Sequence, residues 1–271
     1  LVPSRGNNLY RIFDKTAGRE VLRSPASLKQ LEESPFHYGT PLMVPPSRIA
    51  NGRFRFQGRD YQFDINTPNG HHLHGFVRSR PWQIVRTAEE NGAATVTCAF
   101  ATADFPEVMR QYPHPLVMEV TYALSGNKLV HKATVRNEGA ETAPFGYGLH
   151  TWFLLDGRPE EWVLTLPADS IWELNQDLLP TGKRLPLGAL EGLKTGLNLQ
   201  GQDLDTPFFI GNNKREAVLA SPRTKLRYEA SERFKHWVVY TMGKADQYIC
   251  LEPYTWVPNA PNLNEDADVT G

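Results

Sequence analysis

The chain has 271 residues, of which 40% are hydrophobic and 22% charged, a composition typical of a globular protein that buries a sizeable core. Its formal net charge of −1 gives no electrostatic reason to expect nucleic acid or an anionic membrane as a partner. No apolar run approaches the roughly 20 residues of a membrane-spanning helix, and no signal-peptide pattern opens the chain.

The predicted elements in the first half are mostly β-strands. Residues 27–34 (SLKQLEES) show the best helical periodicity, over about two turns. Residues 52–65 (GRFRFQGRDYQFDI) alternate aromatic and polar side chains around a Gln-Gly-Arg-Asp turn, which predicts a hairpin. A strand at 94–102 follows, and a second hairpin joins 116–124 to 128–139 through a Ser-Gly-Asn turn.

The second half continues the strand pattern. Short runs rich in β-branched and aromatic residues, bounded by Gly, Pro, Asn or Asp, lie at 161–167, 171–175, 216–222, 225–231, 236–242 and 247–253. No composition break or fixed repeat divides the chain, so we predict a single domain over residues 1–271. Many strands with few helices predict an all-β fold, built as one large antiparallel β-sandwich.

The two cysteines, Cys98 and Cys250, both lie in apolar strand-like runs. We expect buried free thiols in a cytoplasmic, reducing environment, while a single disulfide between them is the alternative that the sequence leaves open. The chain starts at Leu1 without a methionine, so we expect its natural N-terminus to lie elsewhere.

Three of the eight histidines fall within four positions, in the segment NGHHLHG. Strand alternation predicts that His72 and His74 point to one face and His71 to the other. A His-x-His pair on a strand is a known metal-ligand arrangement, but no carboxylate follows in GFVRSRPW and no zinc motif occurs elsewhere. We predict no metal, with a third ligand from a distant strand as the open alternative. His71 is expected to be structural, and His72 is either structural or a sugar contact.

Two other segments hold candidate functional residues. His150 lies among aromatic and small residues in APFGYGLHTWFLL. Glu252 ends an apolar run in ICLEPYTWVPNAPN, where a buried carboxylate needs polar partners. An exposed glutamate at a strand end is the alternative.

Five segments together resemble the aldose 1-epimerase (galactose mutarotase) family. They are PPSRIANGRFRFQGRDYQF, NGHHLHG with Trp82 after it, PFGYGLHTWF, LDTPF and LEPYTWVPNAPN, in the family's order over residues 45–262. The resemblance implies a β-supersandwich, which agrees with the strand pattern. Residue 271 follows soon after the last segment, so both termini are expected to be clipped relative to the family.

The resemblance also implies roles for individual residues. His74 would polarise a sugar near its ring oxygen, His150 would be the general acid, and Glu252 would be the general base. Arg48 and Asp205 would hold sugar hydroxyls. The implied activity is interconversion of the α and β anomers of a free aldohexose, with the sugar as the only partner of a monomer or homodimer.

This chemistry needs one acid and one base on opposite sides of the acetal, and no cofactor. Glu252 has to start ionised and His150 protonated. Opposite charges in one cleft are expected to raise the pKa of the histidine above its free value of about 6.5. Trp152 and Phe208 are candidates to stack on the C–H face of the sugar, with a place in the core as the alternative for each.

The chain departs from the family pattern in two segments. The run HGFVRSRPW is similar to one in hexose-6-phosphate 1-epimerases, where Arg78 and Arg80 would face a phosphate; two solvent-exposed arginines are the alternative. Tyr254 stands where many relatives have glutamine. A hexose-6-phosphate 1-epimerase and a non-catalytic sugar-binding domain are therefore the alternative functions.

Overall fold

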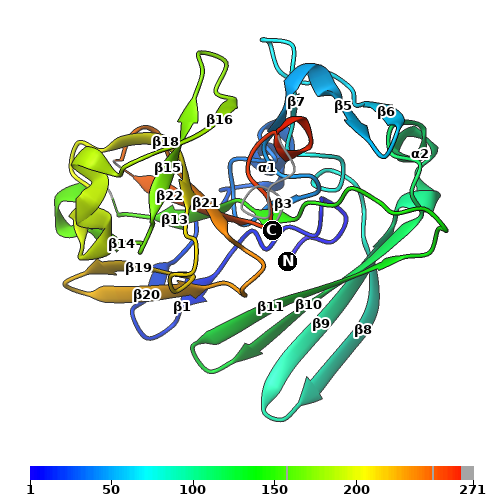
Figure 1. Ribbon diagram of the computed structural model, residues 1–271. Helices are drawn as coiled ribbons and strands as arrows, with labels where there is room; N and C mark the ends of the chain where they lie inside the picture. Colours follow the sequence, from blue (N-terminus) through cyan, green and yellow to red (C-terminus); the bar gives the residue numbers. More distant parts are fainter. Residues whose placement is uncertain (157, 246, 264–271) are drawn as a thin grey trace.

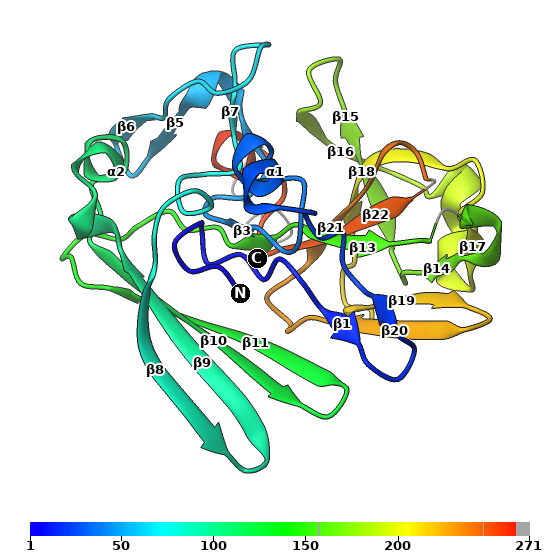
Figure 2. The same cartoon turned by 180° about the vertical axis from the view of Figure 1, so that it is seen from behind.

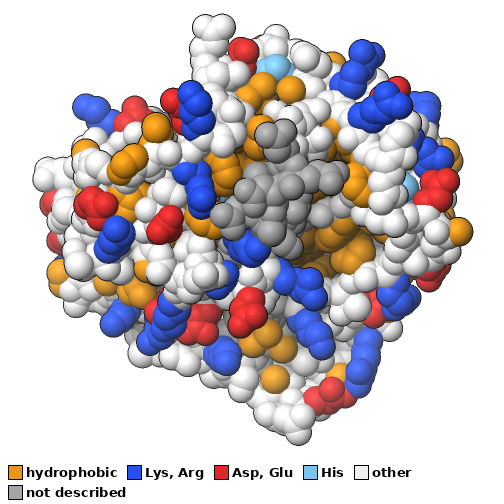
Figure 3. Space-filling model, viewed as in Figure 1, with side chains coloured by type: hydrophobic (Ala, Val, Ile, Leu, Met, Phe, Trp, Pro, Cys, Tyr) orange, Lys and Arg blue, Asp and Glu red, His pale blue; other side chains and the backbone are white. Residues whose placement is uncertain are grey.

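The computed structural model describes residues 1–156, 158–245 and 247–263, and their antiparallel strands confirm the all-β prediction (Figure 1). The expected clipping of the C-terminus concerns residues outside this description. None of the helices in the described ranges is long and apolar enough to cross a membrane. Basic and acidic side chains are interspersed on the face shown in Figure 3, in keeping with the near-zero net charge.

The largest sheet in the described residues has eight strands and carries most of the candidate site. Its order is β16 (Pro180–Leu185), β15 (Ser170–Leu174), β18 (Asp203–Phe209), β21 (His236–Lys244), β22 (Tyr248–Tyr254), β12 (Gly148–Leu149) and β3 (Leu42–Met43), with β13 (Thr151–Leu154) paired to β22. β21 and β22 pair in register from His236–Tyr254 to Tyr240–Cys250. Strands from distant parts of the sequence therefore meet in one layer.

Two four-stranded sheets flank this layer. One has the order β11 (Lys128–Asn137), β10 (Leu116–Ser125), β9 (Ala93–Ala101), β8 (Gln83–Glu90), and the other has the order β17 (Leu197–Asn198), β14 (Val163–Thr165), β19 (Glu216–Ser221), β20 (Thr224–Glu229). The predicted hairpin of β10 and β11 is confirmed, since the strands pair from Leu116–Asn137 to Ser125–Lys128. Figure 2 shows the two sheets on opposite sides of the molecule.

Short elements complete the fold. The paired strands are β1 (Phe13–Asp14) with β2 (Arg19–Glu20), β4 (Arg48–Ile49) with β7 (His72–Leu73), and β5 (Arg53–Phe56) with β6 (Arg59–Gln62). The helices are α1 (Leu28–Glu33), α2 (Pro106–Gln111), η1 (Ala50–Gly52), η2 (Thr102–Asp104), η3 (Pro159–Glu161), η4 (Gly188–Lys194) and η5 (Ala260–Asn262). The predictions of the β5–β6 hairpin and of α1 are confirmed. The Ser27 hydroxyl caps α1 by accepting the Gln30 N–H at 3.2 Å.

The two largest apolar cores of the described residues hold these layers together. One lies behind the eight-stranded sheet and includes Trp162, Phe208, Trp237 and Leu251. The other packs the β9–β10 sheet against the segment that carries β4 to β7, and includes buried Cys98. Cys98 and Cys250 are both buried and free, which confirms that part of the prediction which concerned their burial and pairing.

Burial of a neutral histidine predicts a loss of stability in mild acid. His131 on β11 lies with its Nε2 2.8 Å from the Tyr147 hydroxyl, and burial lowers the pKa of His131 to about 4. Because an unfolded histidine has a pKa of about 6.5, only the unfolded chain gains this proton between pH 6.5 and about 4. We expect His131 alone to lower the free energy of unfolding by about 2 kcal/mol from pH 7 to pH 5.

The measurement is urea unfolding at pH 7 and pH 5. His131→Gln should show a smaller difference between the two pH values than the unchanged chain, although other buried histidines also contribute. If the free energy of unfolding changes equally with pH in the variant and in the unchanged chain, His131 does not cause the loss of stability in acid.

Candidate active site

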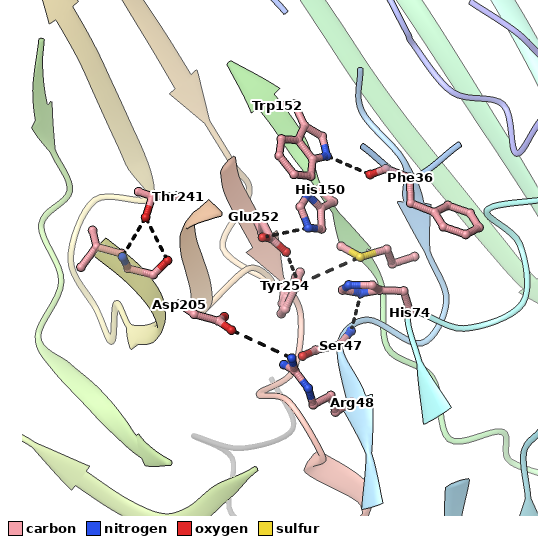
Figure 4. Close-up of polar contacts among 12 residues, drawn as sticks. Phe36, Ser47, Arg48, His74, His150, Trp152, Asp205, Thr241, Glu252 and Tyr254 are labelled. Atoms are coloured by element: carbon pink, nitrogen blue, oxygen red, sulfur yellow. Dashed lines mark hydrogen bonds and ion pairs between the residues drawn. The ribbon is translucent and has the colours of Figure 1, made fainter. Parts of the chain in front are cut away.

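Five of the residues predicted for the site come together on one face of the large sheet (Figure 4). The His150 Nε2 lies 3.2 Å from a carboxylate oxygen, Oε1, of Glu252. The rings of His74 and His150 meet edge to face with centroids 5.4 Å apart. An Arg48 guanidinium nitrogen lies 4.0 Å from Asp205 Oδ2. Residues far apart in the sequence thus line one polar site.

Strand alternation explains how β22 presents Glu252. Ile249 and Leu251 enter the apolar core behind the sheet, so Cys250, Glu252 and Tyr254 point to the opposite face. Glu252 is buried, with 2% of its surface exposed. The Tyr254 hydroxyl donates a short hydrogen bond to Glu252 Oε2. The buried carboxyl group therefore has a partner for each oxygen.

His150 sits between β12 and β13 and is held by aromatic contacts. Its ring stacks on Trp152 with centroids 5.1 Å apart and an interplanar angle of 17°. The Trp152 Nε1–H donates to the Phe36 carbonyl at 2.9 Å, and Trp152 is 1% exposed. This placement corrects the expectation that Trp152 stacks on a sugar: the indole packs behind His150 and fixes the plane of its ring.

The same alternation corrects the expectation for Phe208. On β18, Asp205 faces the site, whereas Leu204 and Phe208 face the opposite way and pack in the core. Phe208 has no exposed surface, so it cannot stack on a ligand in the site.

His74 reaches the site through a special backbone conformation. β7 ends at Leu73, and His74 has φ +62°, so strand alternation does not determine where its side chain points. Its Nδ1 accepts the Ser47 N–H at 3.2 Å. Burial, and then the charge of Arg78, lower the pKa of His74 well below 6.5. A neutral ring that accepts at Nδ1 carries its proton on Nε2, which makes Nε2–H a donor.

The other two histidines of the cluster have structural contacts. His72 Nδ1 lies 2.7 Å from the Asp64 carbonyl, and its ring packs edge to face on Phe63. His71 Nδ1 accepts the Asn51 N–H at 3.1 Å. Both side chains are buried at 5% exposure. These contacts favour the structural alternative for His72 over a sugar contact.

The electrostatics of the central pair differ from the expectation. Burial raises the pKa of Glu252 well above its usual 4.5, and the Tyr254 hydrogen bond opposes that rise. Burial, followed by the charge of Arg78, lowers the pKa of His150 to about 3. Desolvation therefore outweighs mutual attraction, and the prediction of a raised histidine pKa is wrong. In the ligand-free site, both members of the pair favour their neutral forms.

Sequence reasoning missed several residues around the site. Tyr240 on β21 lies edge to face with both His150 and Trp152. In HWVVYTM, Trp237 and Val239 point into the core, so strand alternation could have predicted that Tyr240 points to the opposite face, toward the site. Asn259 adopts φ +61°, donates its N–H to the Arg48 carbonyl at 2.8 Å and accepts the Ala50 N–H at 3.0 Å. It anchors the strand that presents Arg48.

One group of side chains in the described residues has potential metal ligands. Atoms of His150, Cys250 and Glu252 lie within 4.8 Å of one another, and all three side chains are buried. Burial, and then the nearby Glu252, raise the pKa of the Cys250 thiol well above 9. Metals bind the thiolate, so a metal ion at this group would have to displace the proton of Cys250. The direct contact of His150 Nε2 with Glu252 Oε1, at 3.2 Å, is also an arrangement that permits proton transfer.

The Tyr254 hydroxyl allows a test of how Glu252 is held. Tyr254→Phe removes the hydrogen bond that opposes the raised pKa of Glu252. We expect the turnover of sugar anomers to fall by about tenfold with a smaller change in KM, because the base becomes harder to ionise. The check is kcat and KM from polarimetry, and an unchanged kcat would exclude a role for this contact.

Comparisons with known proteins identify the family of the chain. The model of the aldose 1-epimerase family matches residues 2–268. The uncharacterized protein YihR of Escherichia coli is 30% identical over 246 residues, which are 87% of this chain and 75% of YihR. The galactose mutarotase of the pig (Sus scrofa) is 29% identical over 175 residues, 62% of this chain and 48% of that protein. The match thus spans about half of that mutarotase.

A solved structure shares the fold. The crystal structure of a galactose mutarotase-like protein from Clostridium acetobutylicum superposes with a TM-score of 0.93 at 24% identity, covering 100% of this chain and 85% of the other. The family match over nearly the whole chain and the shared supersandwich architecture lead to one conclusion. The chain belongs to the aldose 1-epimerase family.

Proposed function

We propose that the protein is an aldose 1-epimerase, which interconverts the α and β anomers of an aldohexose by opening and closing its ring. The observation that carries the proposal is the buried contact of 3.2 Å between His150 Nε2 and Glu252 Oε1, beside Arg48 and Asp205. A proton donor and a proton acceptor in contact, next to groups that bind hydroxyls, match the needs of acetal opening.

The reaction needs two proton transfers and no covalent intermediate. Glu252 removes the proton of the anomeric hydroxyl, while His150 delivers a proton to the ring oxygen and the bond from C1 to that oxygen breaks. The aldehyde turns about the bond between C1 and C2, and the ring closes on its other face by the reverse transfers. Each well-placed acid or base contributes about 10²–10⁴-fold to the rate.

The buried pair is suited to this exchange of protons. The pair of Glu252 and His150 has two states with the same number of protons. In the charged pair, a carboxylate faces an imidazolium; in the neutral pair, a carboxylic acid faces a neutral imidazole. Ring opening converts the charged pair into the neutral pair, which is the form that burial favours. Burial therefore lowers the cost of opening, and the reverse proton transfers of ring closure restore the charged pair.

The neighbouring groups bind and orient the sugar in this proposal. His74 donates from Nε2 toward the ring oxygen, since its Nδ1 is occupied by the Ser47 N–H. Arg48 and Asp205 lie far enough apart, at 4.0 Å, to exchange their mutual contact for sugar hydroxyls.

The experiment is polarimetry of freshly dissolved α-D-glucose and α-D-galactose, with and without the protein. The proposal predicts that the optical rotation reaches equilibrium at a rate proportional to protein concentration. Binding of the sugars without any acceleration would instead indicate a sugar-binding domain on the same scaffold.

A chelator tests the proton-transfer assignment against a metal held by His150, Cys250 and Glu252. We expect full mutarotase activity after exhaustive dialysis against EDTA, because the two proton transfers need only the acid and the base. Loss of activity on dialysis that is restored by one equivalent of zinc would favour the metal instead.

A further inference from the structure

A third donor atom lies beside the proposed acid and base. Strand alternation puts Cys250 and Glu252 on the same face of β22, and His150 comes from between β12 and β13. His150 Nε2 lies 3.2 Å from Glu252 Oε1, and one donor atom from each of the three side chains lies within 4.8 Å of the other two. A nitrogen, an oxygen and a sulfur therefore surround one point in the site.

The spacing of these atoms fits the ligand shell of a zinc ion. Zinc binds imidazole nitrogen at about 2.0–2.1 Å, carboxylate oxygen at about 2.0–2.2 Å and thiolate sulfur at about 2.3 Å, in a tetrahedral arrangement. These bond lengths separate nitrogen from oxygen by about 3.4 Å, and sulfur from either by about 3.6 Å. The contact between His150 and Glu252 is already close to this spacing. The sulfur needs a shift of at most about 1.2 Å, which rotation about the Cα–Cβ bond of Cys250 supplies.

The charges of the three ligands balance the charge of the ion. Zinc has two positive charges and binds Cys250 as a thiolate, Glu252 as a carboxylate and His150 as a neutral imidazole. The complex then has no net charge, so burial disfavours it far less than it disfavours each isolated charge. Binding releases the proton of the thiol and the proton of the carboxylic acid to solvent.

The ligand set also indicates which metals can bind. A thiolate favours zinc over magnesium and calcium, which prefer oxygen ligands. The sugar of the proposed reaction has to reach His150 and Glu252, and an opening that admits a pyranose also admits a hydrated metal ion. With three protein ligands, a water molecule takes the fourth position.

We propose that His150, Cys250 and Glu252 form an inhibitory binding site for zinc. The inhibition rests on the proposed epimerase function, because zinc would occupy both the imidazole that delivers a proton and the carboxylate that removes one. Zinc and the sugar therefore compete for the same two side chains. The metal-free protein is the active form, in line with the activity expected after dialysis against EDTA.

The test measures the rate of mutarotation by polarimetry at increasing zinc concentration, relative to the zinc-free rate of each variant. Cobalt(II) supplies a second measurement that does not depend on activity, since a thiolate bound to cobalt absorbs in the near ultraviolet. Cys250→Ala removes the proposed sulfur ligand. Cys98→Ala is the matched control, because Cys98 is also a buried, free cysteine on a strand, β9. Magnesium is the control ion.

We expect zinc to halve the rate of the unchanged protein at a concentration of about 1 μM, and more sugar to raise that concentration. Cys250→Ala should need at least about 100-fold more zinc, since even the loss of a hydrogen bond to a metal ligand costs about 10- to 100-fold in affinity. Cys98→Ala should respond to zinc as the unchanged protein does. Magnesium should not inhibit, and EDTA should restore the full rate. Cobalt should produce the absorption band in the unchanged protein and in Cys98→Ala, but not in Cys250→Ala.

Full activity at about 1 mM zinc would overturn the inference and leave the epimerase proposal intact. Equal sensitivity to zinc of the unchanged protein and a folded Cys250→Ala variant would do the same. If the protein accelerates no sugar, the epimerase proposal fails and the cobalt band alone decides whether the metal site exists. A band missing from the unchanged protein overturns the site. The chain has two cysteines, so a band kept by Cys98→Ala identifies Cys250 even if Cys250→Ala folds poorly.

Discussion

Glu252→Gln is expected to lower the turnover of sugar anomers by at least about 100-fold, because the amide cannot accept the anomeric proton. The substitution keeps the size of the side chain and leaves an oxygen that can accept the Tyr254 O–H. The fold should be unchanged or more stable, since a costly buried ionisable group is removed. The measurement is kcat by polarimetry, together with a melting temperature.

Glu119→Gln is the matched control. Glu119 also lies on a β-strand, but its side chain is 40% exposed and pairs with Arg136. It should show normal kcat and a nearly unchanged melting temperature. A Glu252→Gln variant that keeps turnover within about tenfold would exclude Glu252 as the base.

His150→Asn and His74→Asn are expected to change kcat and KM in different ways. His150→Asn should chiefly lower kcat, by about 10²-fold or more, because proton delivery to the leaving oxygen matters most in the transition state. His74→Asn should raise KM and lower kcat together, since it removes the Nε2–H that would bind the sugar while keeping an acceptor for the Ser47 N–H. The measurement is kcat and KM of both variants with the same sugar.

The neighbouring histidines are the controls for this pair. His72→Asn should lose less than about tenfold in turnover, because its ring packs on Phe63. His71→Asn should be nearly silent in turnover, and any cost should fall on stability, since His71 accepts the Asn51 N–H. If His71→Asn is as damaging as His74→Asn, the histidines act as a unit that these contacts do not explain.

Local patterns predicted much of the strand structure. The two hairpins, at β5–β6 and β10–β11, combine alternating side chains with turn residues, and both signals lie within a short stretch of sequence. β8 was not predicted, because seven of its eight residues are exposed and it shows no apolar alternation. Its pairing with β9 holds it in place, and the sequence of one strand does not reveal which strand it pairs with.

The site was only partly predictable for related reasons. The segments around His150 and Glu252 marked as candidates two residues that the structure brings into contact. The direction of the His74 side chain, in contrast, depends on a left-handed backbone conformation. The packing of Trp152 behind His150 and of Phe208 in the core depends on contacts between distant strands. The direction of the His150 pKa depends on burial and on Arg78, and neither can be derived from spacing along the chain.

The central claim is that the protein opens the sugar ring by two proton transfers, from the anomeric hydroxyl to Glu252 and from His150 to the ring oxygen. Ring opening breaks the bond between C1 and the ring oxygen and leaves the anomeric oxygen on C1. The most direct measurement follows anomer exchange and loss of the anomeric oxygen in one sample. The sample is the sugar that the protein turns over fastest, labelled with 13C at C1 and with 18O in the hydroxyl on C1. We predict rapid anomer exchange with 18O lost no faster than in buffer, and no acceleration with Glu252→Gln. Loss of 18O in step with anomer exchange, or equal acceleration by the variant, would contradict the account.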